Sequence, residues 1–334
     1  MDFRVANHEH ENMTGMRKGS MEYWPHRRAK KQMPRVRTWP TIAEQGFEGG
    51  VAVKAGMTHI MMVDDSDSPS KGTEVSRAVT VLEIPKMFIY GIRFYKNKYL
   101  YKEPASEAYD ENLGKKVGIN KSSHKLADLK GKLNEFNDVT ALAFVDPSNL
   151  GFGNKHVMRF ELHVGGKDVK EKADFVEKWL GKEIKISDVV GVGDYIDTIS
   201  ISKGKGWAGV IKRFKVSRGY RKATNKIRHV GVLGPWHPAK VMFTVPHSGH
   251  MGYNYRLEMN KRILKMGTDK DANAVNAKGG FINYGVIKND YIMLDGSIPG
   301  PAKRLIRFRK ALRSSAPKKA PQINYISIAS KQGA

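Results

Sequence analysis

The chain has 334 residues, 40% of them hydrophobic and 9% aromatic, which predicts about two folded domains and excludes disorder throughout. Cysteine is absent, which excludes disulfides, thiolate zinc sites and a cysteine nucleophile. No transmembrane run of about 18 apolar residues and no apolar stretch of a secretory signal occurs, so we expect a cytoplasmic protein without a membrane partner.

The net charge is +25, from 58 Lys and Arg against 33 Asp and Glu, and it is unevenly distributed. Residues 198–257 hold 12 Lys or Arg and no acidic residue, residues 296–334 hold 9 and none, and residues 16–40 hold 8 against Glu22 alone. The rest of the chain is therefore close to neutral. This predicts a folded body with three basic segments, which repel themselves and become ordered on a polyanion. Solvated basic faces are the alternative, but such faces usually mix both signs of charge.

A basic, proline-broken stretch lies near the start of the chain. Residues 1–13 look unlike the residues after them and are expected to be either a tail or an extension of the reading frame ahead of a start at Met13 or Met16. Residues 17–40 (RKGSMEYWPHRRAKKQMPRVRTWP) mix cations with aromatic residues, and Pro25, Pro34 and Pro40 interrupt any helical or strand period. This pattern predicts an extended arm.

Strands and two helices are expected next. The strand-like segments are 51–63 (two strands joined by a turn at Lys54–Gly56), 78–95, 141–147, 157–164 and 193–201. Residues 123–136 predict a short helix. Residues 169–180 carry one apolar stripe and are followed by Gly181, which predicts an amphipathic helix with a glycine cap.

The chain returns to strands after the acid-free segment. Residues 251–267 predict a short helix closed by Gly267, and residues 281–287, 290–298 and 304–312 predict strands. Short strands near both ends favour a β-barrel or sandwich, and the helix-bearing middle favours an inserted α/β part. The expected fold class is therefore mainly β with an α/β insertion.

Three glycines after the predicted strand 193–201 match the dinucleotide pattern G-x-G-x-x-G. They are Gly204, Gly206 and Gly209 in KGKGWAG. A dinucleotide site also needs an acidic residue about 20 positions later to hold the ribose. No acidic residue occurs before Glu258, and VIKRF is a poor start for a helix, so no cofactor is expected. Close approach of the backbone to a phosphodiester chain is the favoured interpretation.

Histidines raise the question of a metal or catalytic site. His247 and His250, or His8 and His10, supply two ligands each, but a closed site without cysteine needs converging carboxylates. None lies near His247, and Ser248 beside it has no acidic partner for a triad. We therefore expect neither a metal nor a catalytic residue.

The acid-free segment is itself the strongest candidate site. Its basic residues alternate with aromatic ones, namely Trp207, Phe214, Tyr220, Trp236, Tyr253 and Tyr255. Cations neutralise phosphates, and aromatic rings stack on unpaired bases. The sequence Gly234-Pro235-Trp236-His237-Pro238 suits the tip of a long loop, because the prolines restrict regular structure around the tryptophan. Burial of Trp236 in a core is the alternative.

Several segments resemble the large-subunit ribosomal protein three family, archaeal type. They are KAGMTHI, SKGKGWAGVIKRF, RHVGVLGPWHPAKVMFTVPHSGHMGYNYRLEMNKRILKMG and INYGVIKNDYIMLDGSIPGPAKRLIRFRK, preceded by the basic arm. The resemblance runs from about residue 17 to 313 in the family's order and is least specific in residues 64–190. It implies a translation-factor-like β-barrel, an α/β insertion, and a long basic loop that reaches into ribosomal RNA toward the peptidyl-transferase centre.

The resemblance implies a domain division and a set of contact residues. The division is a basic arm (1–45), a β-barrel body (46–63 and 185–334) interrupted by an RNA-penetrating loop (203–257), and an α/β insertion (64–184). Trp236 and His237 would lie at the loop's tip, with Arg221, Lys222, Lys226 and Arg228 on its approach. The expected RNA-binding residues are Arg17, Lys18, Trp24, Arg27, Arg28, Lys30, Lys31, Arg35 and Arg37 in the arm, and Lys203, Lys205, Trp207, Lys212, Arg213, Arg221, Lys222, Lys226, Arg228, Trp236, His237, His247, Tyr253 and Arg256 in or beside the loop.

The expected function is structural. The family implies a constituent of the large ribosomal subunit that binds ribosomal RNA and neighbouring proteins, assists early assembly and catalyses no reaction. An RNA-modifying enzyme that uses the basic loop as a substrate platform is one alternative, but it needs a general base beside the basic channel. A chromatin-like or membrane-surface protein is the other, and the aromatic residues within the loop suit folded RNA better.

Overall fold

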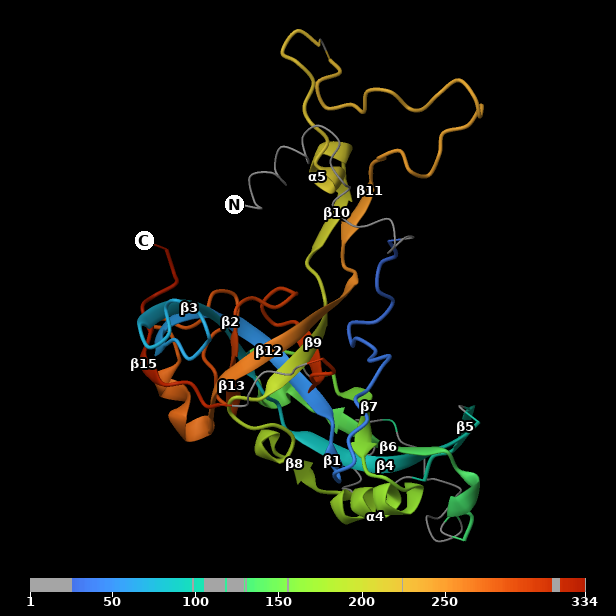
Figure 1. Ribbon diagram of the computed structural model, residues 1–334, viewed down its shortest axis with the longest axis vertical. Coiled ribbons are helices and arrows are strands. Elements are labelled where there is room, and N and C mark those ends of the chain that lie inside the picture. Colours follow the sequence, from blue (N-terminus) through green and yellow to red (C-terminus); the bar gives the residue numbers. More distant parts are fainter. Residues whose placement is uncertain are drawn as a thin grey trace. The chain divides into compact units, whose positions relative to one another are not determined.

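Seven strands form the larger sheet of the computed structural model, which describes residues 26–97, 99–104, 118, 129, 131–154, 156–223, 225–313 and 319–333. They are β2 (Gly49–Val63), β3 (Glu74–Glu83), β9 (Tyr195–Ile201), β12 (Tyr255–Gly267), β13 (Tyr291–Asp295), β14 (Leu305–Lys310) and β15 (Ile323–Ile326). Their order is β14-β9-β12-β13-β3-β2-β15. Figure 1 labels all of these strands except β14. Because β14 pairs with both β9 and β2, consecutive pairing links the strands β14, β9, β12, β13, β3 and β2 into a closed ring.

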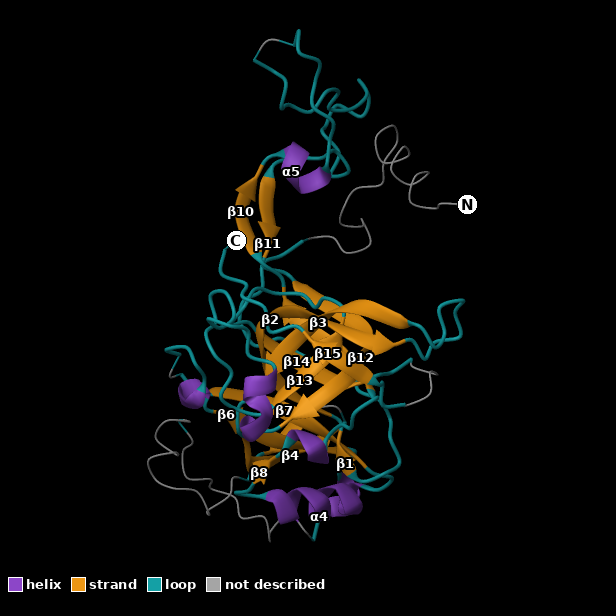
Figure 2. Cartoon of the chain, turned by 90° about the vertical axis from the view of Figure 1, so that its left-hand side faces the viewer, coloured by secondary structure: helices purple, strands orange, loops and turns teal. Residues whose placement is uncertain are grey.

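A smaller sheet is built from the strands of the middle of the chain. It contains β1 (Gly46–Phe47), β4 (Met87–Lys96), β5 (Tyr99–Lys102), β6 (Asp138–Val145), β7 (Met158–Gly165) and β8 (Glu183–Ile184). Helix α4 (Val169–Trp179) packs against this sheet with Ala173 and Val176 buried (Figure 2). The ring of Phe47 lies 5.1 Å from that of Phe175 and 5.6 Å from that of Trp179. Short 3-10 helices lie at Leu133–Glu135, Pro147–Asn149, Ile186–Asp188 and Asp269–Ala274.

Both sheets belong to one of two compact units. This unit, which we call the body, comprises Lys31–Ile201 and Arg256–Ala334. The second, which we call the hairpin unit, comprises Ser202–Tyr255 and the residues up to Lys30, of which the structure describes 26–30. It contains β10 (Gly204–Ala208), helix α5 (Val210–Phe214) and β11 (Gly249–Gly252). No helix in the described part of the chain is long and apolar enough to cross a membrane.

Most expected elements are present. The strands predicted at 141–147, 157–164, 193–201, 290–298 and 304–312 are confirmed as β6, β7, β9, β13 and β14. The helix at 169–180 is confirmed as α4, and Gly181 after it has the left-handed φ of 75° that favours glycine. The segment 78–95 forms two strands, β3 and β4. The helix predicted at 123–136 lies largely outside the described residues, apart from the turn at Leu133–Glu135.

Three predictions of local structure are wrong. Residues 54–56 form a bulge within one continuous strand, β2, instead of a turn; a side chain at Gly56 would collide with the ring of Phe281. Residues 255–267 form strand β12 instead of a helix, because pairing with β9 and β13 outweighs the helix propensity of the segment. Residues 281–287 form turns with an isolated bridge between Phe281 and Gly285 instead of a strand.

The range expected for the insertion, residues 64–184, includes strand β3. Strand β3 pairs along its length with β2 and through residues 79–83 with β13, so it is part of the seven-stranded sheet. Its final residues are fully buried, from Val79 at 0% exposure to Glu83 at 0%. The sequence suggested otherwise because β2 and β13 are separated by more than 200 residues, and only the pairing shows that β3 lies between them.

Candidate nucleic-acid interface

A two-stranded ladder closes the base of the hairpin unit. Strands β10 and β11 are antiparallel, with Trp207 opposite His250 and Gly204 opposite Gly252. Gly252 has a φ of 79°, and a side chain there would collide with the carbonyl oxygen of Lys203, so this position requires glycine. The ladder makes residues 209–248 one excursion that leaves and returns at the same place.

Helix α5 follows β10 directly, although the sequence VIKRF is an unfavourable start for a helix. The turn forms because Val210 and Phe214, four positions apart, are both buried. The guanidinium of Arg213 lies 4.9 Å from the Phe214 ring centroid, and its Nη1 donates to the carbonyl oxygen of His247 at 2.9 Å. Burial lowers the pKa of Arg213. Arg213 therefore holds the outgoing and returning chain together within the hairpin unit.

The excursion beyond α5 carries no helix or strand among its described residues, and its large side chains are exposed. Tyr220 is 91% exposed, Val232 83%, Trp236 88% and Phe243 69%. The Trp236 ring contacts His237 edge-on, with centroids 6.5 Å apart. The alternative of a core tryptophan at position 236 is therefore wrong.

The predicted cationic contacts of the excursion lie on its surface. Exposed side chains at the predicted positions are those of Lys203, Lys205, Lys212, Arg221, Lys222, Lys226 and Arg228, and His237 and His247 are exposed as well. Because residues 198–257 contain no carboxylate, none of these cations has an acidic neighbour within the segment. Trp207, 69% exposed, adds an aromatic face, and its ring meets His250 at 5.2 Å. Positive charge and accessible rings are the two features that nucleic acid recognises.

Residues 26–30 of the arm lie against the same hairpin. The amide of Ala29 donates to the carbonyl oxygen of Tyr253 at 2.8 Å, and Asn254 Nδ2 donates to the carbonyl oxygen of Arg27 at 2.8 Å. Arg27, Arg28 and Lys30 are exposed. The structure thus brings these predicted contacts together with Tyr253, which is half-buried, whereas Arg17, Lys18 and Trp24 lie outside the described residues.

Residues 31–45 of the arm pack on the body. Pro34, Val36 and Pro40 are buried. Lys31, which precedes them, and Arg35 and Arg37, which lie between them, are exposed. Arg307 of β14 donates to the carbonyl oxygen of Pro34 at 3.4 Å, and Arg309 donates to that of Thr38. The expectation that the whole arm is ordered by a polyanion is wrong for this part, because protein contacts already hold it. Arg256, the last predicted contact, is exposed at the start of β12 in the body.

A partly buried charge network anchors the arm at Trp39. The Trp39 ring stacks on His163, with centroids 5.8 Å apart and planes at 16°. The His163 ring nitrogens lie 2.6 Å from Glu48 and 3.2 Å from Asp138. Burial alone would lower the pKa of His163, but these two carboxylates outweigh it and raise the pKa to about 9. His163 is therefore a cation at neutral pH beneath the tryptophan.

The basic stretch 296–334 is not a projecting arm, contrary to the expectation from its charge. Its residues Arg304, Arg307 and Arg309 are 8%, 5% and 3% exposed. Arg309 pairs with Asp197 of β9 at 3.1 Å, and burial lowers the pKa of Arg307 to about 10. The strand predicted at 304–312 contains Arg307 and Arg309, but no signal in the sequence indicated that this strand buries both arginines within the body.

The glycine pattern after β9 has the strand and helix of a dinucleotide site but not its chemistry. Gly206 lies in β10 with a φ of 63°, and α5 starts at Val210 after Gly209. The helix has five residues, and the segment has no carboxylate to hold a ribose. The glycines instead shape the β10 and β11 ladder.

A mainly β body joined to an acid-free, exposed excursion of cations and aromatic rings defines the class of nucleic-acid-binding proteins. The chain belongs to the family described as Ribosomal protein L3, whose model matches residues 9–333. It is 41% identical over 330 residues to the "Large ribosomal subunit protein uL3" of Methanothermobacter thermautotrophicus, covering 95% of this chain and 98% of that protein. Proteins of the same name from Methanobrevibacter smithii (39% over 328 residues, 95% and 98%) and Methanocaldococcus jannaschii (40% over 336 residues, 96% and 99%) are similar. The resemblance predicted from the sequence is confirmed.

Proposed function

We propose that this chain is a structural protein of the large subunit of the cytoplasmic ribosome, that it binds large-subunit RNA and that it catalyses no reaction. Membership of the ribosomal protein L3 family over residues 9–333 carries this conclusion. Relatives whose names place them in the large subunit align with 95% or more of the chain. The alternative of an RNA-modifying enzyme finds no support in the family.

The hairpin unit is the proposed RNA-penetrating part. Its exposed cations have no carboxylate within residues 198–257 to neutralise them, so phosphates are their natural counterions. Trp236 and His237 form the proposed tip near the peptidyl-transferase centre, and the tryptophan's 88% exposure leaves its face open for stacking on a base. Arg213 is assigned a mainly internal role because it donates to the carbonyl oxygen of His247.

The arm is the second proposed RNA-facing part. Arg35 and Arg37 alternate with the buried residues Pro34 and Val36, so the side chains of both arginines face outward from the body. The contacts of Arg307 and Arg309 with the arm's backbone fix this orientation before RNA binds. We further propose a role in early assembly, since prearranged cations lower the entropy lost on binding.

The finer architecture is also proposed. The ring of pairings through β14 supports a translation-factor-like barrel, and the smaller sheet with α4 supports an α/β insertion between its early and late strands. In this division the hairpin unit interrupts the barrel between β9 and β12. The exposed cations therefore lie on an excursion whose base is closed by the β10–β11 ladder.

Site-specific crosslinking in purified large subunits tests the proposal. A photoreactive amino acid at position 236 is expected to crosslink to large-subunit RNA, whereas one at the half-buried Trp39 is expected to give far less RNA adduct. Density-gradient sedimentation of the lysate first establishes whether the full chain migrates with large subunits. Failure to co-migrate would contradict the proposed function, and protein-only crosslinks at position 236 would contradict the tip role.

A further inference from the structure

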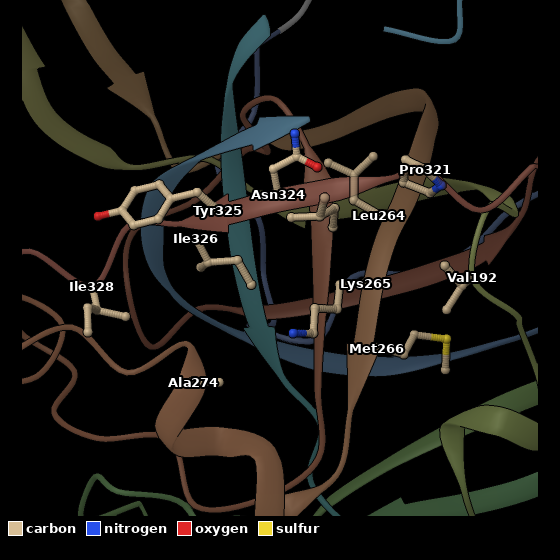
Figure 3. Close-up of a pocket in the computed structure, with 11 residues that line it drawn as sticks. Val192, Leu264, Lys265, Met266, Ala274, Pro321, Asn324, Tyr325, Ile326 and Ile328 are labelled. Atoms are coloured by element: carbon tan, nitrogen blue, oxygen red, sulfur yellow. The ribbon is translucent and has the colours of Figure 1, made fainter. Parts of the chain in front are cut away.

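An apolar slot of about 620 Å³ opens in the body between strands β12 and β15 (Figure 3). Its lining comes mainly from these two strands and includes Leu264, Lys265, Met266, Tyr325 and Ile326. Most of these side chains are apolar, and none belongs to the predicted RNA contacts. The slot therefore has a chemistry different from that of the hairpin unit.

The slot lies along strand edges and not over a sheet face. Successive side chains of a strand point to opposite faces of its sheet. Yet four consecutive residues of β15 (323–326) and three of β12 (264–266) all line this one slot. A cavity beside the edge of a strand borders residues of both faces, so this lining indicates a slot along the edges of β12 and β15.

Both edges lack a partner among the described strands. β15 pairs with β2 and has no neighbour on its other side. β12 pairs with β13 through residues 263–267, and on its opposite side β9 begins only at Tyr195. The last hydrogen bonds on this side are made by Ile263. Its amide donates to the carbonyl oxygen of Asp194 at 2.9 Å, and the amide of Gly193 donates to the carbonyl oxygen of Ile263 at 2.8 Å. Residues 264–266 therefore have no partner among the described strands on the β9 side, where Val192 and Pro321 border the slot.

The dimensions suit one extended peptide. Strands lie about 4.8 Å apart in a sheet, sheets pack about 10 Å apart, and each residue rises about 3.3 Å, so an extended residue occupies roughly 160 Å³. The volume of about 620 Å³ thus holds about four extended residues. Unpaired strand edges with side-chain pockets recognise peptides by strand addition.

The lining also indicates the composition of the peptide. Apolar side chains such as Leu264, Met266 and Ile326 favour apolar residues, while the ammonium of Lys265 forms no hydrogen bond or ion pair with any described residue. One carboxylate would complement it. RNA is a poor fit, because a phosphate chain would meet a single cation among apolar groups.

We propose that the slot binds an extended, mostly apolar segment of a neighbouring protein of the large subunit, which adds as a strand between β12 and β15 and places one carboxylate on Lys265. The neighbour's identity as a large-subunit protein rests on the proposed function. Such a contact joins the body to a second protein through residues other than the cations of the hairpin unit.

Photo-crosslinking from the full chain in purified large subunits tests this inference. A photoreactive residue replaces Tyr325, which is 52% exposed in the slot, and the control replaces Ile282, which is 51% exposed elsewhere. Mass spectrometry is expected to map the adduct of position 325 to one apolar segment of another large-subunit protein, and the control is expected not to reach that segment. Adducts only with RNA, adducts with a second copy of this chain, or no adduct would overturn the inference.

Two variants refine the test. Lys265→Glu is expected to lower the yield of that adduct several-fold through charge repulsion, while Lys182→Glu, on an exposed lysine beside β8 in the smaller sheet, is expected to leave it unchanged. An equal yield in both variants would contradict the carboxylate contact. If the chain is missing from large subunits altogether, the proposed function fails; if it is present without a protein adduct at position 325, only this inference fails.

Discussion

The guanidinium of Arg307 lies 5.5 Å from the centroid of the Trp39 ring, and the same ring stacks on the cationic His163. A tryptophan from the arm is thus held by two cations of the body, the buried Arg307 and the half-buried His163. The Phe160 ring, also 5.5 Å from the guanidinium, completes the site around Arg307. Because cations attract aromatic faces most strongly when water is excluded, these contacts anchor the arm.

Trp39→Ala is expected to release residues 34–40 from the body and to lower the free energy of unfolding by about 2 kcal/mol, through loss of the stacking and cation–π contacts. Amide hydrogen exchange of residues 34–40 and urea denaturation measure the two effects. Trp236→Ala is the matched control, since that side chain is 88% exposed and its loss should leave stability unchanged. Equal stability of both variants would contradict the anchoring role.

Stability is expected to fall with rising pH through His163. Its pKa is raised from 6.5 to about 9 in the folded chain, so its stabilising effect is complete below pH 6.5 and is lost as the pH rises through 9. The loss is about 3 kcal/mol at most. Urea denaturation between about pH 6 and pH 10 checks it. In His163→Gln this part of the pH dependence should vanish, and an unchanged profile would rule out His163 as its source.

Arg309→Met is expected to cost about 3–5 kcal/mol, because it leaves the fully buried carboxylate of Asp197 without its counterion. Arg35→Met, which removes an exposed arginine of the arm, should change stability little. The double variant Arg309→Met with Asp197→Asn should recover part of the loss, since no buried charge remains. A double-mutant cycle in urea would show no coupling if the pair were unimportant.

RNA binding by the isolated chain is expected to weaken steeply with salt, with a log–log slope of about −0.7 to −0.9 per phosphate neutralised. Arg221→Ala should make this slope shallower by about 0.7 to 0.9, which is the contribution of one phosphate contact. Arg304→Ala is unsuitable as a control because Arg304 is buried, so Lys278→Ala in the body serves instead. Filter binding on a large-subunit RNA fragment at several salt concentrations measures the slopes, and equal slopes for Arg221→Ala and the parent chain would contradict a phosphate contact.

The charge distribution and the strand periodicity could be determined from the sequence alone. A run of residues without a carboxylate, 198–257, predicted the exposed excursion, because unpaired cations cannot be buried without a large loss of solvation. Segments with strong local patterns, such as the alternation in 157–164 and the stripe in 169–180, formed the expected strand and helix. The resemblance to a family extended this to function.

Long-range pairing decided the rest. Residues 255–267 have ordinary helix formers, but β9 and β13 recruit them into a strand. Arg307 and Arg309 look like part of a basic tail, yet Asp197, Trp39 and the arm's carbonyl groups neutralise or solvate them within the body. The sequence by itself determined where charge accumulates along the chain. Only the tertiary structure decided which of those charges meet solvent and which meet a buried partner, because the partners lie more than 100 residues away and are brought together by folding alone.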